Sequence, residues 1–392
     1  MRYDFDEQVR RENTQSYKFD YTREYFGTAE LIPMWVADMD FRTPDFIMEA
    51  IRKRTEHEIL GYSIRPDSFY QAVIDWYGKR QDWTIARDTI LFSPGVVPAL
   101  SMAVNAYTRE GEKVIVQSPV YHPFFSVVKD NRRQLVYNML AEDEGHYRMD
   151  LDDLKGKIDR DTKLLLLCHP HNPVGRVWSP SELRDLAAIC LENNMVIISD
   201  EIHSDLVFHP HVHTPLCTLS DEIAGITVTC VAASKTFNIA GLSSSVVVIS
   251  DEKLHAKFSH ELQKGHLHMG NIFGNVAMEA AYSQGADWLE QLLTYLKGNA
   301  GLLTRFAEEN LPGIRVRSPE ATYLAWLDMR SLGMNPMELR EFMVREARIG
   351  CNDGPSFGPG GTGFQRLNFG CPRSTLEKAL GRLNTALDKR RS

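Results

Sequence analysis

The stretch Ile226-Thr-Val-Thr-Cys-Val-Ala-Ala-Ser-Lys-Thr-Phe-Asn-Ile-Ala-Gly241 joins an apolar, β-branched run to a lysine, Lys235. A run that is apolar through most of its length is typical of a strand buried on both faces of a parallel sheet. Ligands of open α/β sheets bind beyond the carboxyl ends of such strands. Partial desolvation there lowers the pKa of a lysine amine and makes it nucleophilic. A single lysine is most often a surface residue, so the rest of the chain has to support this interpretation.

Four further runs show the same apolar pattern as the strand expected at Ile226–Val231. They are Lys113–Gln117, Lys163–Cys168, Met195–Ser199 and Ser245–Ile249. Amphipathic stretches separate the runs, such as Ser181–Asn193, where apolar residues recur at helical spacing. This alternation predicts a doubly wound α/β sheet with right-handed crossovers.

The pattern changes near residue 285. A long helix is expected at about Trp288–Asn310, and a bend inside it is expected to join two domains. After it come an alternating strand at Tyr323–Asp328, a helix near Met337–Ala347 and a short strand at Gln365–Phe369. This order of elements predicts a smaller α+β domain.

Size and composition limit the possible functions. A chain of 392 residues is too long for one ordinary core, so two domains are expected. The net charge of −8 lacks the basic excess of a nucleic-acid binder. No apolar run reaches the roughly 18 residues of a membrane span, and the start of the chain has no apolar signal-peptide core. None of the six cysteines forms a C-x-x-C pair, which favours reduced, mostly buried thiols in a cytosolic protein.

Two polar residues follow other predicted strands. Asp200 ends the run at Met195–Ser199, and a carboxylate there could keep a pyridine nitrogen protonated, which makes the ring an electron sink. The same aspartate could instead cap the next helix. Asn172 follows Lys163–Cys168 in the turn His171-Asn-Pro-Val-Gly175, which would fix its amide towards a ring hydroxyl oxygen. Taken alone, that tetrapeptide is more often an ordinary turn.

Two more stretches fit a phosphorylated aromatic ligand. Gly95, in Ser93-Pro-Gly-Val-Val-Pro98, opens a helical stretch whose backbone N–H groups would bind an anion. A hydroxyl such as that of Ser234 must contribute as well, because the helix dipole alone is worth only about 0.3–1 kcal/mol. Tyr121 follows Lys113–Gln117 and could stack on a ring, although it could equally be a half-buried turn residue.

Together, in this chain order, the signals resemble the fold-type I enzymes that depend on pyridoxal 5′-phosphate (PLP), the aspartate-aminotransferase superfamily. Within it, the chain looks most like the MalY/PatB-type cystathionine β-lyases, or C–S lyases. The resemblance covers nearly the whole chain and is carried by Pro33–Phe41, Gly61–Ser63, Ser93–Pro98, Pro119–Phe124, His171–Gly175, Ser199–His203, Ser234–Leu242, Pro319–Leu324 and Arg366–Phe369.

The resemblance implies a PLP-dependent transferase-like α/β fold. A large domain, residues 46–285, would hold a mostly parallel seven-stranded sheet flanked by helices. A smaller α+β domain would combine residues 1–45 with residues 286–392. The family also implies a homodimer with active sites at the interface.

The resemblance also implies the roles of the site residues. Lys235 would carry PLP as a Schiff base, Asp200 would pair with the pyridine nitrogen, and Tyr121 would stack on the ring. The other implied cofactor contacts are Asn172, His203, Gly95, Val96, Val97, Ser234 and, from the neighbouring subunit, Tyr62. Arg366 would bind the substrate α-carboxylate through its guanidinium fork, with Trp35, Ala37 and Asn172 as further substrate contacts.

Two departures from the wider superfamily bear on these roles. Many aminotransferases have Tyr where this chain has His203, and the form Asp-Glu-Ile-His resembles the C–S lyase branch. Many also have Ser where this chain has Ala232, so one hydroxyl contact to the phosphate is missing. No metal site is expected at His209-Pro-His-Val-His213, because the prolines indicate a loop and no motif completes a four-ligand shell.

The expected reaction is β-elimination from cystathionine or a related S-substituted cysteine, giving a thiol, pyruvate and ammonia. The amine of Lys235 would be the base for the Cα proton, and Tyr121, Tyr62 or Lys235 would protonate the leaving thiol. Transamination with a 2-oxo acid by the same residues is the first alternative. A regulatory protein-binding role beside catalysis is the second, while direct binding of nucleic acid or membrane is not expected.

Overall fold

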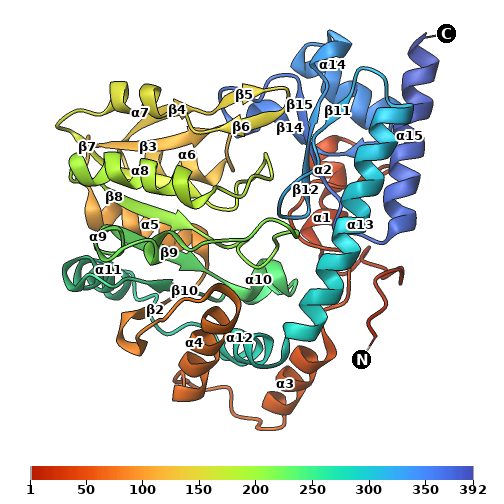
Figure 1. The fold of residues 1–392 in the computed structure, drawn as a ribbon. Helices are drawn as coiled ribbons and strands as arrows, with labels where there is room; N and C mark the ends of the chain where they lie inside the picture. The colour runs from red at the N-terminus through yellow and green to blue at the C-terminus, as the bar shows by residue number, and fades with distance from the viewer. Residues whose placement is uncertain (1, 392) are drawn as a thin grey trace.

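The computed structural model describes residues 2–391 and is built around a seven-stranded sheet (Figure 1). Its strands, in spatial order, are β2 (Ile90–Ser93), β10 (Ser245–Val248), β9 (Thr227–Val231), β8 (Val196–Asp200), β7 (Thr162–Cys168), β3 (Lys113–Ser118) and β4 (Gln134–Met139). The five strands from β9 to β4 run parallel. The predicted mostly parallel, seven-stranded α/β sheet is therefore confirmed.

One strand runs in the direction opposite to the predicted one. The run Ser245–Ile249 forms β10, which is antiparallel to both β9 and β2. All four residues of β10 are buried. A strand covered on both faces carries the same apolar pattern whichever way it runs, so the pattern could not reveal its direction.

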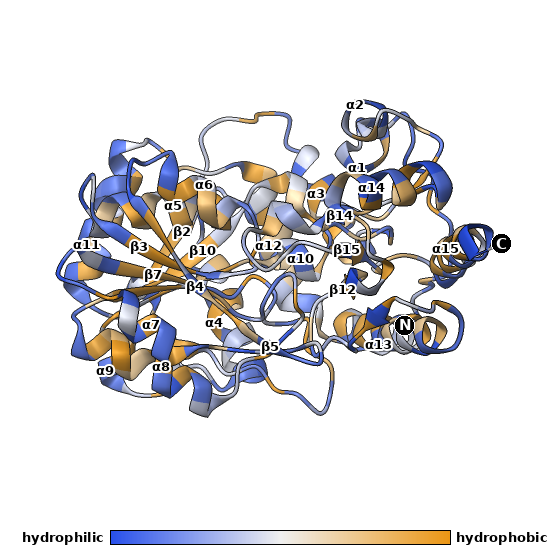
Figure 2. Ribbon diagram, turned by 90° about the horizontal axis from the view of Figure 1, so that it is seen from above, coloured by the Kyte–Doolittle hydropathy of each residue, from blue (hydrophilic) through white to orange (hydrophobic). Residues whose placement is uncertain are grey.

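Helices cover both faces of the sheet, and Figure 2 shows apolar strands inside and hydrophilic helix surfaces outside. The helices of this part are α3 (Asp45–Thr55), α4 (Asp67–Gln81), α5 (Val96–Tyr107), α6 (Pro123–Lys129), α7 (Leu151–Lys157), α8 (Pro180–Glu192), α9 (Asp221–Ala224), α10 (Ala233–Thr236), α11 (Glu252–Lys264) and α12 (Ile272–Gln284), of which α3 packs on α12 and α10 lies at the strand ends. Helix α8 matches the predicted helix at Ser181–Asn193 closely. It begins with a capping box in which Ser179 and Glu182 satisfy each other's backbone N–H groups.

Beyond the strand ends lies a second part of the molecule, on the right in Figure 1. A four-stranded antiparallel sheet joins β11 (Arg315–Val316), β12 (Leu324–Asp328), β15 (Phe364–Asn368) and β14 (Asn352–Asp353). The helices α13 (Ala286–Asn310), α14 (Pro336–Glu341) and α15 (Arg373–Arg391) pack around it. The β5–β6 hairpin (Ala141–Asp143 and His146–Arg148) reaches towards this part from β4.

The connection between the two parts consists of a turn at Gly285 followed by the long helix α13. Helix α13 runs unbroken, and the chain turns before it, at Gly285 between α12 and α13. A Cβ atom at Gly285 would lie 2.3 Å from the Phe237 ring. Only glycine allows this close approach. The division into domains at 285/286 stays a prediction, because one apolar core continues across Gly285, for example from Phe237 to Trp288.

Two expectations for this part need correction. The strand expected to alternate at Tyr323–Asp328 is buried along all of β12. Trp326 packs on Phe364 on one face of the strand, while Ala325 and Leu327, on the opposite face, belong to a different core cluster. The helix expected near Met337–Ala347 ends as α14 at Glu341 and continues as a π-helical turn over Phe342–Glu346.

The N-terminal segment crosses the end of the four-stranded antiparallel sheet before it reaches α3. It forms α1 (Tyr17–Asp20) and α2 (Thr22–Phe26), and then β1 (Ile32–Pro33) pairs in parallel with β13 (Ile349–Gly350). Buried ion pairs from Lys18 to Asp40 hold the next residues in place. Over residues 2–391, no helix combines the length and apolarity needed to cross a membrane.

Candidate active site

A cavity of about 200 Å³ opens at the carboxyl ends of β7, β8 and β9, on the side of the sheet that faces the second part. Its lining residues are Ala37, Gly95, Val96, Val97, Pro98, Tyr121, Cys168, Asn172, Asp200, Ile202, His203, Ser234, Lys235 and Ala240. Residues predicted separately from five stretches of sequence therefore meet in one place.

Lys235 lies in α10, four residues after β9 ends. Its half-buried side chain extends to the N-terminal segment, where Nζ donates to Ala37 O at 2.6 Å. Burial lowers the pKa of the amine from 10.5 to about 8, although the nearby carboxylates Asp38 and Asp200 oppose this shift. A substantial fraction of the amine is thus neutral, and nucleophilic, near neutral pH.

Asp200 is the last residue of β8 and is buried in the cavity wall. Its Oδ1 accepts a hydrogen bond from Ile202 N at 3.1 Å, and Oδ2 has no hydrogen-bond partner within residues 2–391. Burial raises the pKa of this carboxyl to about 7, and the positive charge of Lys235 lowers it again. A carboxyl in this state would be stabilised as an anion by a cationic partner placed in the cavity.

Two aromatic side chains approach the same space. His203 is 3% exposed, and its Nδ1 atom is buried without a hydrogen-bond partner. Desolvation lowers the pKa of His203 to about 3, so its ring is neutral and offers one donor and one acceptor nitrogen. Tyr121 is fixed by its backbone, because its N–H donates to Asn172 O at 3.1 Å. Burial raises the pKa of the Tyr121 hydroxyl.

The start of α5 forms an anion cradle in the cavity. Gly95 is the N-cap of this twelve-residue helix, and the N–H groups of Val96 and Val97 belong to its first turn. N–H groups in the first turn have no acceptor within the helix, and the helix dipole favours an anion there. Ser234 lies on the same cavity wall and supplies a hydroxyl.

Arg366 lies behind the cavity, in β15. Its Nη1 donates to Asn172 Oδ1 at 3.0 Å, and its Nη2 donates to Trp35 O and Asn352 Oδ1 at 2.8 and 2.7 Å. Its Nε is buried without a partner. Desolvation lowers the pKa of this guanidinium to about 10, so it stays charged near neutral pH and favours a further anionic partner.

Three predicted site residues do not line the cavity, namely Arg366, which lies behind it, Trp35 and Tyr62. The indole of Trp35 packs on Tyr25 and donates to Lys18 O, so only its carbonyl reaches Arg366. Tyr62 is 98% exposed in the loop between α3 and α4. Substrate contact by Trp35 and cofactor contact by Tyr62 stay predictions, and the second requires another subunit.

Some residues at the site were not predicted from the sequence. Cys168 and Ile202 line the cavity, and Tyr323 donates to Ala37 O at 2.9 Å. The position of Cys168 at the end of a buried strand was a usable signal. Tyr323 lies in Pro319–Leu324, one of the stretches that carry the resemblance, but its role did not follow from that stretch because its partner lies 286 residues away in the chain.

The three alternate histidines separate into two environments. His209 and His211 are exposed, whereas His213 is buried, with its Nε2 2.8 Å from Glu201 Oε2. Glu201 also accepts from Ser199 Oγ and Leu216 N, so this cluster ties the loop after β8 to the sheet. In the part of the chain that the structure describes, no group of three or more His, Cys, Asp or Glu residues could hold a metal ion.

A model of the family described as aminotransferase class I and II matches residues 29–383. The chain belongs to this family. It is 46% identical over 384 residues to cystathionine beta-lyase PatB of Bacillus subtilis (strain 168), covering 98% of this chain and 99% of PatB. The predicted family, and the resemblance to PatB-type lyases within it, are confirmed.

Solved structures of the family agree with the fold. Cystalysin from Treponema denticola, which contains PLP, superposes with a TM-score of 0.96 at 36% identity over all of both chains. A PLP-bound putative aminotransferase from Clostridium difficile 630 gives 0.97 at 45% identity, over 98% of this chain and 100% of that one. The PLP-dependent transferase-like fold is therefore confirmed.

The cavity suits the group that these relatives contain. The unpartnered Oδ2 of Asp200 suits a protonated ring nitrogen, and the unpartnered Nδ1 of His203 suits a polar ring substituent or a water. The α5 cradle with Ser234 suits a phosphate. Lys235 supplies an amine for an aldehyde. The residues present therefore fit PLP.

Proposed function

We propose that this chain is a PLP-dependent C–S β-lyase that cleaves L-cystathionine, or a related S-substituted cysteine, to a thiol, pyruvate and ammonia. The observation that carries the proposal is the 46% identity to PatB along nearly the whole chain. The cavity supports it, because it holds an amine, a carboxyl and an anion cradle that suit PLP. An amino acid as substrate fits a member of this family.

When bound, PLP would supply an electron sink that takes up the electron pair left on Cα when the substrate loses its Cα proton. Lys235, Asp200, Asn172, His203, Tyr121, Ser234 and the backbone of Gly95, Val96 and Val97 would hold it. Asp200 would keep the ring nitrogen protonated. Arg366 would bind the substrate carboxylate, and Lys235 Nζ would take the Cα proton. Tyr121, Tyr62 or Lys235 would protonate the leaving thiol.

Incubation with L-cystathionine tests the activity. We expect equal amounts of homocysteine and pyruvate without any added 2-oxo acid. Turnover that depends strictly on a 2-oxo acid would contradict the proposal.

Transamination is the second candidate function. The family description and the C. difficile structure, a putative aminotransferase, favour it. The same residues would bind the amino acid, but the product would be a keto acid that keeps the substrate side chain. Retention of the Cβ–S bond during turnover would identify this reaction.

We further propose that the enzyme is a homodimer and that Tyr62 reaches the active site of the second subunit. The loop between α3 and α4 exposes Ile59, Leu60, Tyr62 and Ile64 at 60–98% of their surface. Arg65 ties this loop to the one before α12, through His268 O and Met269 O. So much exposed apolar surface on two adjoining loops suits a second copy of the chain. A cytosolic location and a regulatory protein partner stay predictions.

A further inference from the structure

One carbonyl oxygen connects the candidate catalytic lysine to a buried tyrosine. Ala37 O accepts a hydrogen bond from Lys235 Nζ at 2.6 Å and another from Tyr323 Oη at 2.9 Å. A carbonyl oxygen has two lone pairs, so these two donors use its full capacity. The amine can therefore place one N–H on this oxygen, and Tyr323 holds the other acceptor position.

The Ala37 carbonyl is held in place without help from Tyr323. On either side of it, Val36 O and Asp38 O each accept from Asn368 Nδ2 at 2.6 Å. Trp35 O accepts from Arg366, and Met34 O accepts from Asn368 N. The segment 34–38 is thus fixed across the end of β15, and removal of one hydroxyl would leave its carbonyls in position.

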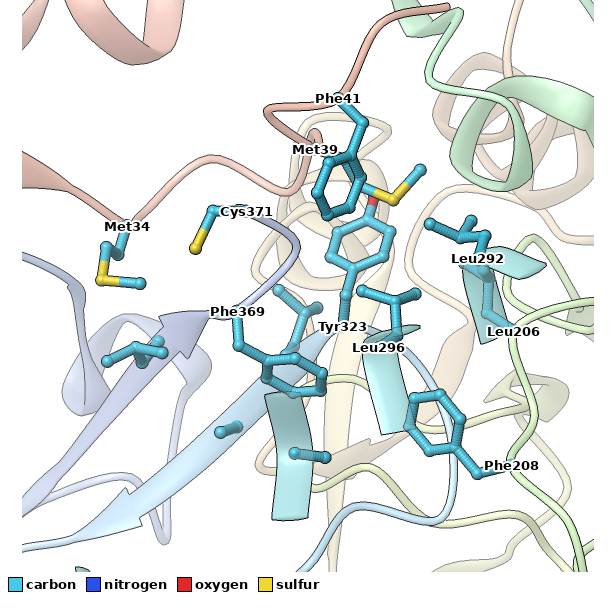
Figure 3. Packing of buried hydrophobic residues seen from close by; sticks show 14 of the residues in the cluster. Met34, Met39, Phe41, Leu206, Phe208, Leu292, Leu296, Tyr323, Phe369 and Cys371 are labelled. Atoms are coloured by element: carbon cyan, nitrogen blue, oxygen red, sulfur yellow. The ribbon is translucent and has the colours of Figure 1, made fainter. Parts of the chain in front are cut away.

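Tyr323 acts as a permanent donor. Its side chain is fully buried, and Figure 3 shows its hydroxyl end directed towards the segment that carries Met39 and Phe41, with Leu296 and Phe369 beside the ring. Burial raises the pKa of this hydroxyl well above 10, so it stays protonated at any pH the enzyme meets. It cannot itself be the base for the substrate proton.

We propose that Tyr323 is a positioning residue that acts on the Lys235 amine through the Ala37 carbonyl. By occupying one lone pair, the hydroxyl weakens that oxygen as an acceptor for an ammonium group and favours the neutral amine. With one N–H on Ala37 O, the nitrogen lone pair is free to point into the cavity. The inference rests on the proposed function, in which this lone pair takes the Cα proton.

The other groups that act on the amine would not change when Tyr323 is altered. Asp38 of the N-terminal segment and Asp200 of β8 stabilise the ammonium form, whereas Arg366 of β15 opposes it. His203 also faces the amine and is neutral. A change in the amine on loss of the Tyr323 hydroxyl alone can thus be assigned to the shared carbonyl.

The test is the variant Tyr323→Phe, in the full-length protein purified with PLP, stripped with hydroxylamine and offered PLP again over a range of pH. The rate of PLP capture, followed by absorbance, reports the neutral fraction of the Lys235 amine. We expect the apparent pKa of capture to rise by about half a unit, which makes capture at pH 7 about threefold slower. In the reloaded enzyme, kcat for cystathionine should fall by about tenfold with little change in KM.

Tyr77→Phe is the matched control. Tyr77 is fully buried and loses a comparable hydrogen bond, to the Tyr282 hydroxyl at 3.0 Å, in the core between α4 and α12. Its capture profile should match that of the wild type. Coincident profiles for Tyr323→Phe and the wild type would overturn the inference.

A second variant tests the direction of the effect and does not depend on the stability of the first. Site-specific 3-fluorotyrosine at position 323 is a stronger donor, so the pKa of capture should fall below that of the wild type. A shift in the same direction as Tyr323→Phe would indicate altered packing and overturn the inference. The capture measurement needs no lyase activity, so these profiles can be correct even if no pyruvate is formed, and that outcome would remove only the proposed function.

Discussion

Arg366 and Asn172 are joined by a hydrogen bond from Nη1 to Oδ1 at 3.0 Å, across 194 residues of chain. One residue is the predicted carboxylate clamp and the other a predicted contact of the cofactor ring. Arg366 belongs to the four-stranded antiparallel sheet, and Asn172 follows the end of β7. The hydrogen bond between them therefore brings polar groups of these two elements to the same space. Substrate and cofactor would therefore be positioned relative to each other by protein groups that touch.

The guanidinium fork of Arg366 is expected to matter more than its charge. Arg366→Lys keeps the charge but cannot bond Asn172, Asn352 and a carboxylate in one plane. We expect KM for the amino acid to rise by about 10- to 100-fold, for the loss of about 1.5–3 kcal/mol in charged hydrogen bonds, while PLP affinity changes little. Arg373→Lys is the control, because Arg373 bonds Asn299 outside the cavity. An unchanged KM in Arg366→Lys would contradict the assignment.

The buried carboxyl of Asp200 should make the stability of the PLP-stripped protein depend on pH. Its pKa is about 7 when folded and near 3.8 in the unfolded chain, so the folded state binds the extra proton between these values. Stability should therefore fall as pH rises from about 4 to 7, and Asp200→Asn should remove this contribution. At pH 8 we expect the variant to be more stable than wild type by about 1–3 kcal/mol in urea unfolding. PLP should reverse this order.

Asp185→Asn, an exposed change on α8, is the control for that experiment and should leave the pH profile unaltered. Equal pH profiles for wild type and Asp200→Asn would contradict the burial argument.

Subunit mixing tests the contribution of Tyr62. Tyr62→Ala and Lys235→Ala should each be nearly inactive alone. Mixed in equal amounts, they should regain about a quarter of the wild-type activity, because half of the dimers are hybrids with one intact site of two. Activity that stays at the level of the separate variants would show that Lys235 and Tyr62 do not combine between subunits.

Two glycines at and within α13 should respond in opposite ways to alanine. At Gly285 a Cβ would lie 2.3 Å from Phe237, so Gly285→Ala should cost about 1–3 kcal/mol of stability through overpacking. A Cβ at Gly301, inside α13, would have no neighbouring atom within 4 Å, so Gly301→Ala should gain about 0.5–1 kcal/mol. Thermal unfolding of the two variants measures both. A stabilised Gly285→Ala would show that the α12–α13 turn is less tightly packed.

Residues that follow buried strands could be predicted from the sequence. Lys235, Asp200 and Asn172 come at or after the ends of β9, β8 and β7, and the ends of parallel strands gather at one edge of a sheet. The roles of these residues came from the resemblance, because position alone does not define chemistry. The direction of β10 could not be predicted, since its apolar pattern is the same either way.

Contacts made through backbone carbonyls were beyond prediction. Tyr323 acts on Ala37 O, and Arg366 on Trp35 O, across 286 and 331 residues. A carbonyl exists at every position, so no residue type marks the acceptor. The need for glycine at position 285, between α12 and α13, was equally hard to predict, because it arises from the Phe237 ring, which is distant in sequence and packs against the backbone there.

The most direct test of the account is borohydride reduction of the PLP-loaded enzyme, followed by peptide mapping. Lys235 is the lysine that lines the cavity, so the account predicts a near-visible absorbance that reduction abolishes and a single labelled peptide containing Lys235. Absence of the absorbance, or a label on any other lysine, would contradict it.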